Sequence, residues 1–106
     1  MNTPKPQEPL RSEFAADPEM LELVELYVAD MPDRVALLRR HWDAHEAEDV
    51  RRIAHQLKGA SAGYGFPTVG EAARELEEAL KDETQELERL AAEFDALVDV
   101  CSRVTL

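Results

Sequence analysis

The sequence of 106 residues has one cysteine, one tryptophan, four glycines and few basic residues. A single cysteine cannot form an internal disulfide framework and is typical of a reducing compartment. The 12 Lys and Arg residues face 23 Asp and Glu, a formal net charge of -11, which disfavours nucleic-acid binding. No apolar run approaches the ~20 residues of a membrane span, and the N-terminus lacks a signal-peptide core. We therefore expect a soluble, cytoplasmic protein, which its acidity keeps monomeric.

The chain has enough apolar sequence for one helical core. Apolar residues make up 44% and charged residues 33% of the chain. The apolar residues recur in steps of three and four, which predicts amphipathic helices, and no strand-like alternation appears. The expected helices are 18–31, 32–47, 48–64, 67–81 and 84–104. The last four predict an all-α fold, an antiparallel four-helix bundle, with 18–31 as an additional N-terminal helix.

Prolines mark several of these boundaries. Asp17 and Pro18 are typical of a helix start, and Pro32 is expected to end the first helix and begin the second. Prolines among polar residues in 1–13 predict a flexible N-terminal tail. Leu10 could still let the end of this tail lie across the bundle. The bundle domain is then 14–106.

The last predicted helix has an apolar seam that continues to the end of the chain. Leu90, Leu97 and Cys101 lie on it, so we expect all three to be buried. Cys101 is then a small core residue rather than a reactive thiol.

The stretch 54–66 differs from the other helices because its polar side is distinctive. On a helical projection His55 lies about 160° from the apolar stripe and should face solvent. Arg51 and Arg52 lie one turn before it, and Lys58 and Gly59 one turn after it. Glycine inside a helix is unfavourable by ~1 kcal/mol relative to alanine, which suggests that something bulky approaches the ring. The three cationic side chains around His55 suggest that the approaching group is anionic.

The run His-Gln-Leu-Lys-Gly-Ala-Ser at 55–61, followed by Gly65-Phe66, resembles the signature of histidine phosphotransfer (HPt) domains. The resemblance covers about 17–106 and implies that His55 is a phosphoacceptor. It would exchange phosphoryl groups with the aspartate of a response-regulator receiver domain, alone or within a sensor hybrid kinase. The Mg²⁺ would be bound in the receiver, and the chain itself would need no cofactor. The competing interpretation is that His55 is an ordinary solvated histidine.

Roles for the neighbours of His55 follow from this resemblance. Lys58 can offset phosphoryl charge, and Gly59 leaves a flat approach for the partner. The family often places Gln or Glu on the following helix, and here Glu77 would accept Nδ1–H and leave Nε2 as the nucleophile. Alternatively, Glu77 is one more solvated acid. The remaining candidates for docking and charge compensation are Arg51, Arg52, Ala62, Arg74 and Lys81.

Other functions are less compatible with the sequence. His41 and His45 stand at i,i+4 and could share a metal, but no third ligand is apparent and Trp42 between them indicates a core edge. No nucleotide-binding glycine-rich loop is present, so we expect a stoichiometric phosphocarrier without autokinase activity. A helical adaptor that binds receiver or kinase domains without being phosphorylated remains the alternative.

Overall fold

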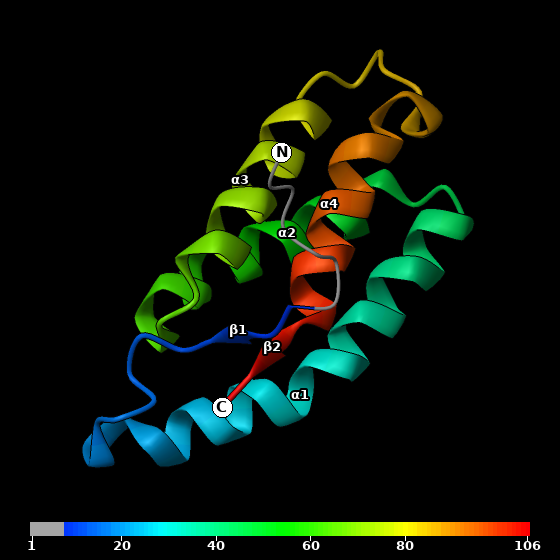
Figure 1. Ribbon diagram of the computed structural model, residues 1–106. Helices are drawn as coiled ribbons and strands as arrows, with labels where there is room; N and C mark the ends of the chain where they lie inside the picture. Colours follow the sequence, from blue (N-terminus) through cyan, green and yellow to red (C-terminus); the bar gives the residue numbers. More distant parts are fainter. Residues whose placement is uncertain (1–7) are drawn as a thin grey trace.

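Four amphipathic segments fold into a bundle of α-helices in the computed structural model, which describes residues 8–106 (Figure 1). The helices are α1 (Pro18–Asp43), α2 (Ala47–Ser61), α3 (Pro67–Leu80) and α4 (Ala91–Ser102). Two 3-10 helices, η1 (Ala62–Tyr64) and η2 (Leu87–Leu90), follow α2 and precede α4. The predicted all-α bundle is confirmed. No helix in this described part of the chain is long and apolar enough to cross a membrane.

The first helix continues through Pro32, so the prediction of separate helices 18–31 and 32–47 is wrong. The expected additional N-terminal helix is the first half of α1. Pro32 is exposed, while Met31 beside it is 1% exposed, and Val24 and Leu38 on either side are 0% exposed. Proline inside a helix costs ~3 kcal/mol, whereas each large apolar side chain gains about 1.5–3 kcal/mol when fully buried. Burial on both sides of the proline therefore outweighs the local penalty.

The predicted end at residue 47 is also wrong, because α1 ends at Asp43 and Ala47 already belongs to α2. The remaining boundaries agree with the sequence except at the last helix. The stretch predicted as 48–64 is α2 followed by η1, and α3 begins at Pro67 as expected. The predicted helix 84–104 is shorter: 84–86 form a turn, η2 is a separate 3-10 helix, and α4 begins only at Ala91. Asp82 explains the turn, because its Oδ1 accepts hydrogen bonds from the Thr84 backbone and hydroxyl at 3.0 and 2.6 Å.

The core lies between the four helices, and α2 and α3 run side by side within it (Figure 1). Its fully buried side chains include Leu57, Leu76 and Leu97. The rings of Trp42 and Phe94 stack with centroids 4.2 Å apart, so the tryptophan packs in the bundle as expected. The seam residues Leu90, Leu97 and Cys101 are all buried, as predicted, and so is Phe94.

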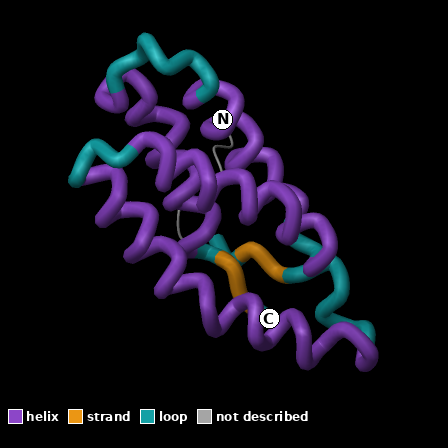
Figure 2. The backbone as a smooth tube through the Cα atoms, turned by 180° about the vertical axis from the view of Figure 1, so that it is seen from behind, coloured by secondary structure: helices purple, strands orange, loops and turns teal. Residues whose placement is uncertain are grey.

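Two short strands bring the ends of the described chain together (Figure 2). β1 (Leu10–Arg11) pairs in parallel with β2 (Val104–Thr105), and Leu10 packs against the core. The strands have two residues each, which is too short for alternation to be visible in the sequence. The predicted flexible tail, 1–13, falls in part outside the described residues, since these begin at residue 8.

The segment after β1 contacts the turn that follows α2. Ser12 donates a hydrogen bond to the Tyr64 carbonyl at 2.6 Å, and the Glu13 N–H donates to the Gly65 carbonyl at 2.9 Å. Gly65 has φ 85°, and a Cβ there would collide with the Ser12 hydroxyl and lie 2.7 Å from the Glu13 nitrogen. The end of the α2–η1 segment is thereby fixed against the chain that leads into α1.

Candidate functional site

His55 lies in the middle of α2 on the side opposite the core. The buried side of this helix contains Val50, Ile53 and Leu57, which are at most 4% exposed. The side chain of His55 is 65% exposed, so it faces solvent as the helical projection predicts. A rigid, packed helix therefore presents an accessible imidazole.

Glu77 of α3 reaches this imidazole from the neighbouring helix. Its Oε2 lies 2.7 Å from His55 Nδ1, and its side chain is only 7% exposed. The two helices approach each other closely at Gly70 of α3, where an added Cβ would lie 3.6 Å from the Lys58 carbonyl and 3.7 Å from the Ser61 Cβ. Glu77 is therefore not a solvated acid, unlike Glu78 beside it, which is exposed.

The carboxylate of Glu77 is also in contact with a cation. Lys58 Nζ lies 2.6 Å from Oε1, the oxygen that does not bind His55. This contact with Lys58 lowers the pKa of Glu77, burial opposes it, and the bond to His55 lowers the pKa further; the net effect is a lowered pKa. Glu77 is thus ionised at neutral pH.

The charge of Glu77 decides which nitrogen of His55 carries the proton. A carboxylate has no proton to donate, so His55 Nδ1 must be the donor in the 2.7 Å contact. The neutral imidazole then has its lone pair on Nε2, which is the nitrogen without a protein partner in the described structure. The arrangement leaves one nucleophilic nitrogen open to solvent.

The expected role of Lys58 in offsetting phosphoryl charge suggests an ammonium that points to open solvent beside His55. The structure does not show this arrangement. The Lys58 ammonium is bound to Glu77, and its side chain is 34% exposed. The sequence contains both halves of this contact, a lysine three residues after His55 and an acid on the next helix. The sequence alone does not predict the ion pair, because the contact depends on how α2 and α3 pack.

Two arginines line a cavity beside His55. The cavity has a volume of about 430 Å³ and is lined by Glu48, Arg51, Arg52, His55 and Glu77. Both arginines are bound within their own helix: Arg51 Nε lies 3.3 Å from Glu48, and Arg52 lies 2.7 Å from Asp49. Their charges are therefore partly neutralised at this surface.

The other predicted docking residues lie on either side of His55. Gly59 is exposed on α2 and Ala62 is exposed at the start of η1, and a Cβ on Gly59 would meet nothing within 4 Å. On α3, Arg74 is exposed, and Lys81 forms an ion pair with Glu78 at 2.9 Å just beyond the end of that helix. The surface around the imidazole is thus open along α2 and charged along α3.

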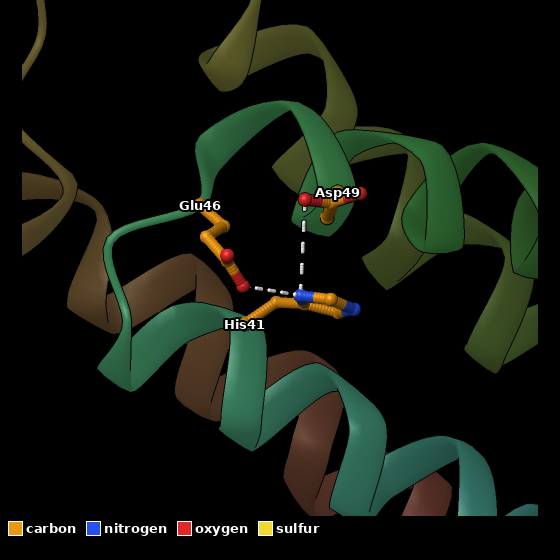
Figure 3. Close-up of side chains that lie close together, drawn as sticks. All are labelled: His41, Glu46 and Asp49. Carbon is orange, nitrogen blue, oxygen red and sulfur yellow. Dashed lines mark hydrogen bonds and ion pairs between the residues drawn. The ribbon is translucent and has the colours of Figure 1, made fainter.

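The two histidines of the first helix and its following turn are not brought together as a metal-binding pair. His45 Nε2 lies 2.8 Å from Glu88 of η2, whereas His41 Nδ1 lies 2.7 Å from Glu46. His41 instead groups with Glu46 and Asp49, whose oxygen atoms face the same ring nitrogen (Figure 3).

A comparison with protein families gives one match: the family described as the Hpt domain matches residues 22–105. The matched range begins within α1, ends in β2 and includes both His55 and Glu77. No curated protein and no solved structure matches the chain.

Proposed function

The chain belongs to the Hpt domain family, and on that premise we propose that His55 carries a phosphoryl group and exchanges it with the aspartate of receiver domains. Hpt domains act in histidine phosphotransfer and interact with receiver domains and kinases of two-component systems. The observation that supports the assignment to His55 is that its two ring nitrogens have different environments. Nδ1 is bound to a buried carboxylate, while the other ring nitrogen faces solvent.

The proposed transfer is a displacement at phosphorus. The Nε2 lone pair attacks the phosphorus of an aspartyl phosphate, an N–P bond forms, and the bond to the aspartate oxygen breaks, releasing the carboxylate. The imidazole ring gains positive charge because Nδ1 keeps its proton. Glu77, 2.7 Å from Nδ1, stabilises that charge. The reverse sequence returns the phosphoryl group to a receiver.

The neighbouring residues have supporting roles in this proposal. Lys58 keeps Glu77 ionised in the unphosphorylated protein, and its flexible stem lets the ammonium turn toward a phosphoryl group. Gly59 provides room for the partner to approach the ring. Contacts to the partner come from the surrounding surface, formed by Arg51, Arg52, Ala62, Arg74 and Lys81.

The chain acts here as a stoichiometric carrier. Hpt domains are phosphocarrier modules, and we propose that this one neither binds ATP nor phosphorylates itself. The Mg²⁺ needed for transfer would be held by the receiver, so the chain needs no cofactor for this step. The single cysteine supports a cytoplasmic location as part of the same proposal.

Phosphoryl transfer from a receiver tests the proposal directly. The full chain is mixed with a receiver domain carrying labelled aspartyl phosphate, and the product is treated with acid and with base. We expect acid-labile, base-stable label on the chain. His55→Gln should abolish it, and His45→Gln, which changes another exposed histidine, should not.

The same experiment separates the carrier from the adaptor. An adaptor would bind the receiver, whether or not His55 is present, and would acquire no label. Label that persists in His55→Gln would assign phosphorylation to another residue and contradict the proposal.

A further inference from the structure

His41, Glu46 and Asp49 meet where α1 passes into α2 (Figure 3). His41 belongs to the last turn of α1, Glu46 ends the connecting turn, and Asp49 belongs to the first turn of α2. His41 Nδ1 lies 2.7 Å from Glu46 Oε1 and 3.8 Å from Asp49 Oδ2. One potential ligand atom from each residue thus lies within 4.8 Å of the other two.

The surrounding structure holds these side chains in position. His45, with φ 59°, closes the turn, and the Glu46 N–H donates to the His41 carbonyl at 2.9 Å. Arg52 donates a 2.7 Å hydrogen bond to Asp49 Oδ1, while the other oxygen, Oδ2, faces His41. The His41 side chain is only 13% exposed, so packing limits the rotation of its ring.

The ion pair between His41 and Glu46 uses only one of the two carboxylates that face the ring nitrogen. Glu46 occupies the N-cap position of α2, but its carboxylate makes no capping hydrogen bond and turns to His41 instead. Asp49 directs a second carboxylate oxygen at the same nitrogen from 3.8 Å, beyond hydrogen-bonding distance. One ring nitrogen therefore faces two carboxylates and can donate to only one of them.

We propose that His41, Glu46 and Asp49 bind a zinc ion or a divalent transition-metal ion of similar chemistry. One imidazole nitrogen and carboxylate oxygens are established zinc ligands, at about 2.0–2.2 Å from the metal. Ligand atoms of a tetrahedral site are then roughly 3.3 Å apart, so the three side chains need only small movements to reach this spacing. Water would complete the coordination.

The charges of the three ligands suit a divalent ion. The two carboxylates balance its charge, and a neutral His41 with its proton on Nε2 supplies the Nδ1 lone pair. Mg²⁺ and Ca²⁺ prefer all-oxygen sites, so the imidazole favours a transition metal over both.

This site is separate from the phosphotransfer residues. Asp49 precedes His55 by six residues, about 9 Å along the helix axis. Bound metal would join the end of α1 to the start of α2, the helix that carries His55. The expected consequence is a more stable corner of the bundle rather than a new reaction.

Calorimetric titration of the full chain with ZnCl₂ in a non-chelating buffer near neutral pH tests the proposal. We expect one equivalent to bind, and we expect His41→Ala and Asp49→Asn each to weaken binding at least tenfold. His45→Asn is the matched control, because it removes a histidine four residues away that contacts Glu88 instead, and asparagine tolerates the positive φ of this turn position. This variant should bind zinc as the unchanged chain does.

Thermal unfolding supplies a second measurement. A ligand that binds only the folded state raises the melting temperature, so Zn²⁺ should raise it for the unchanged chain and for His45→Asn. Asp49→Asn keeps the side-chain shape and should remain folded by circular dichroism while losing this increase. MgCl₂ at the same concentration should give no comparable shift.

Three results would overturn the proposal. The first is no stoichiometric uptake of zinc, and the second is uptake unaffected by both His41→Ala and Asp49→Asn. The third is uptake lost in His45→Asn or in His55→Gln, which would assign the ion to one of the other two histidines of the sequence. Because phosphotransfer is measured separately, failure of either proposal leaves the other intact.

Discussion

At the scale of single residues, the reactivity of His55 depends on what binds its other nitrogen. Glu77 is 5% exposed yet ionised, because Lys58 and His55 contact one oxygen each. A buried carboxylate with two such partners holds the imidazole in one orientation and one tautomer. The nucleophilic nitrogen is therefore fixed before a partner arrives.

Substitution of Glu77 should change the tautomer of His55. In the unchanged protein, nitrogen-15 NMR should show the proton on Nδ1. In Glu77→Ala the tautomer equilibrium should shift toward Nε2–H, and transfer from a receiver should slow by about tenfold or more, since a hydrogen bond to a charged group contributes ~1.5–3 kcal/mol. Slower transfer with an unchanged tautomer would mean that Glu77 acts through something other than positioning.

The lowered pKa of Glu77 also predicts how stability depends on pH. The pKa of Glu77 has its ordinary value of 4.5 in the unfolded chain and a lower value in the folded chain. As the pH falls, the carboxylate of Glu77 therefore takes up a proton first in the unfolded chain. Its contribution to the free energy of unfolding is fully present above pH 4.5 and is lost as the pH falls through the folded value.

Urea denaturation at several pH values measures this contribution. Glu77→Gln cannot ionise and should lose the part of the pH dependence that Glu77 provides, so its stability difference from the unchanged protein should shrink in acid. Glu78→Gln is the matched control, because Glu78 is exposed and ordinary solvent screening weakens its ion pair with Lys81. A difference for Glu77→Gln that stays constant with pH would contradict an ionised, buried Glu77.

At the scale of the elements, the glycines of the α2 segment have different structural roles. A Cβ on Gly59 meets nothing within 4 Å, whereas Gly65 has positive φ and no space beside Ser12 and Glu13. Gly59→Ala should raise the free energy of unfolding by up to ~1 kcal/mol, because alanine is the better helix former. Gly65→Ala should lower it. Chemical denaturation of both variants makes the comparison.

A larger side chain at Gly59 tests the access argument. Gly59→Gln should remain folded but bind a receiver more weakly and accept phosphate more slowly, because the side chain stands beside the ring. Lys58→Ala should slow transfer while affecting receiver binding less. Unaltered binding and transfer in Gly59→Gln would show that the partner does not approach over this position.

Pro32 shows where local rules and packing disagree. Proline lacks the N–H needed inside a helix, so the sequence predicts a break there, yet α1 continues because Val24, Met31 and Leu38 share one buried stripe. Pro32→Ala should restore the missing hydrogen bond and raise the free energy of unfolding by about 1–2 kcal/mol. This is less than the ~3 kcal/mol intrinsic penalty, because alanine also gives the unfolded chain more freedom.

Pro18→Ala provides the control for that experiment. Pro18 lies in the first turn of α1, where the backbone N–H has no partner within the helix. Its replacement should leave stability unchanged or slightly lower. Equal stabilisation by both substitutions would mean that Pro32 causes no local penalty in α1.

At the scale of the whole molecule, the sequence predicts the helices and the exposed histidine better than it predicts their connections. Periodicity places His55 opposite a buried stripe, and the structure agrees because that stripe packs in the bundle. The Lys58–Glu77 ion pair and the strand pairing of Leu10 with Val104 join distant parts of the chain. Such contacts depend on how helices align in three dimensions, which one sequence read locally does not specify.

The same distinction separates the residues that maintain the fold from those that act at its surface. Leu97 of α4 is 0% exposed, whereas Leu26 of α1 is 60% exposed, so the same substitution should have different effects at the two positions. Leu97→Ala should lower the free energy of unfolding by about 2–5 kcal/mol, the usual cost of a large-to-small change in a core. Leu26→Ala should change it by less than about 0.5 kcal/mol.

Leu97→Ala should also leave phosphate acceptance per folded molecule unchanged, because His55 and its partners lie on α2 and α3 and Leu97 contacts no reacting atom. Urea denaturation gives the stability, and labelling by a receiver under conditions where the variant is folded gives the activity. If labelling falls in proportion to the folded fraction, α4 serves the site only by maintaining the bundle. A loss of labelling in fully folded Leu97→Ala would show instead that packing of α4 sets the alignment of α2 and α3, and with it the 2.7 Å contact between His55 and Glu77.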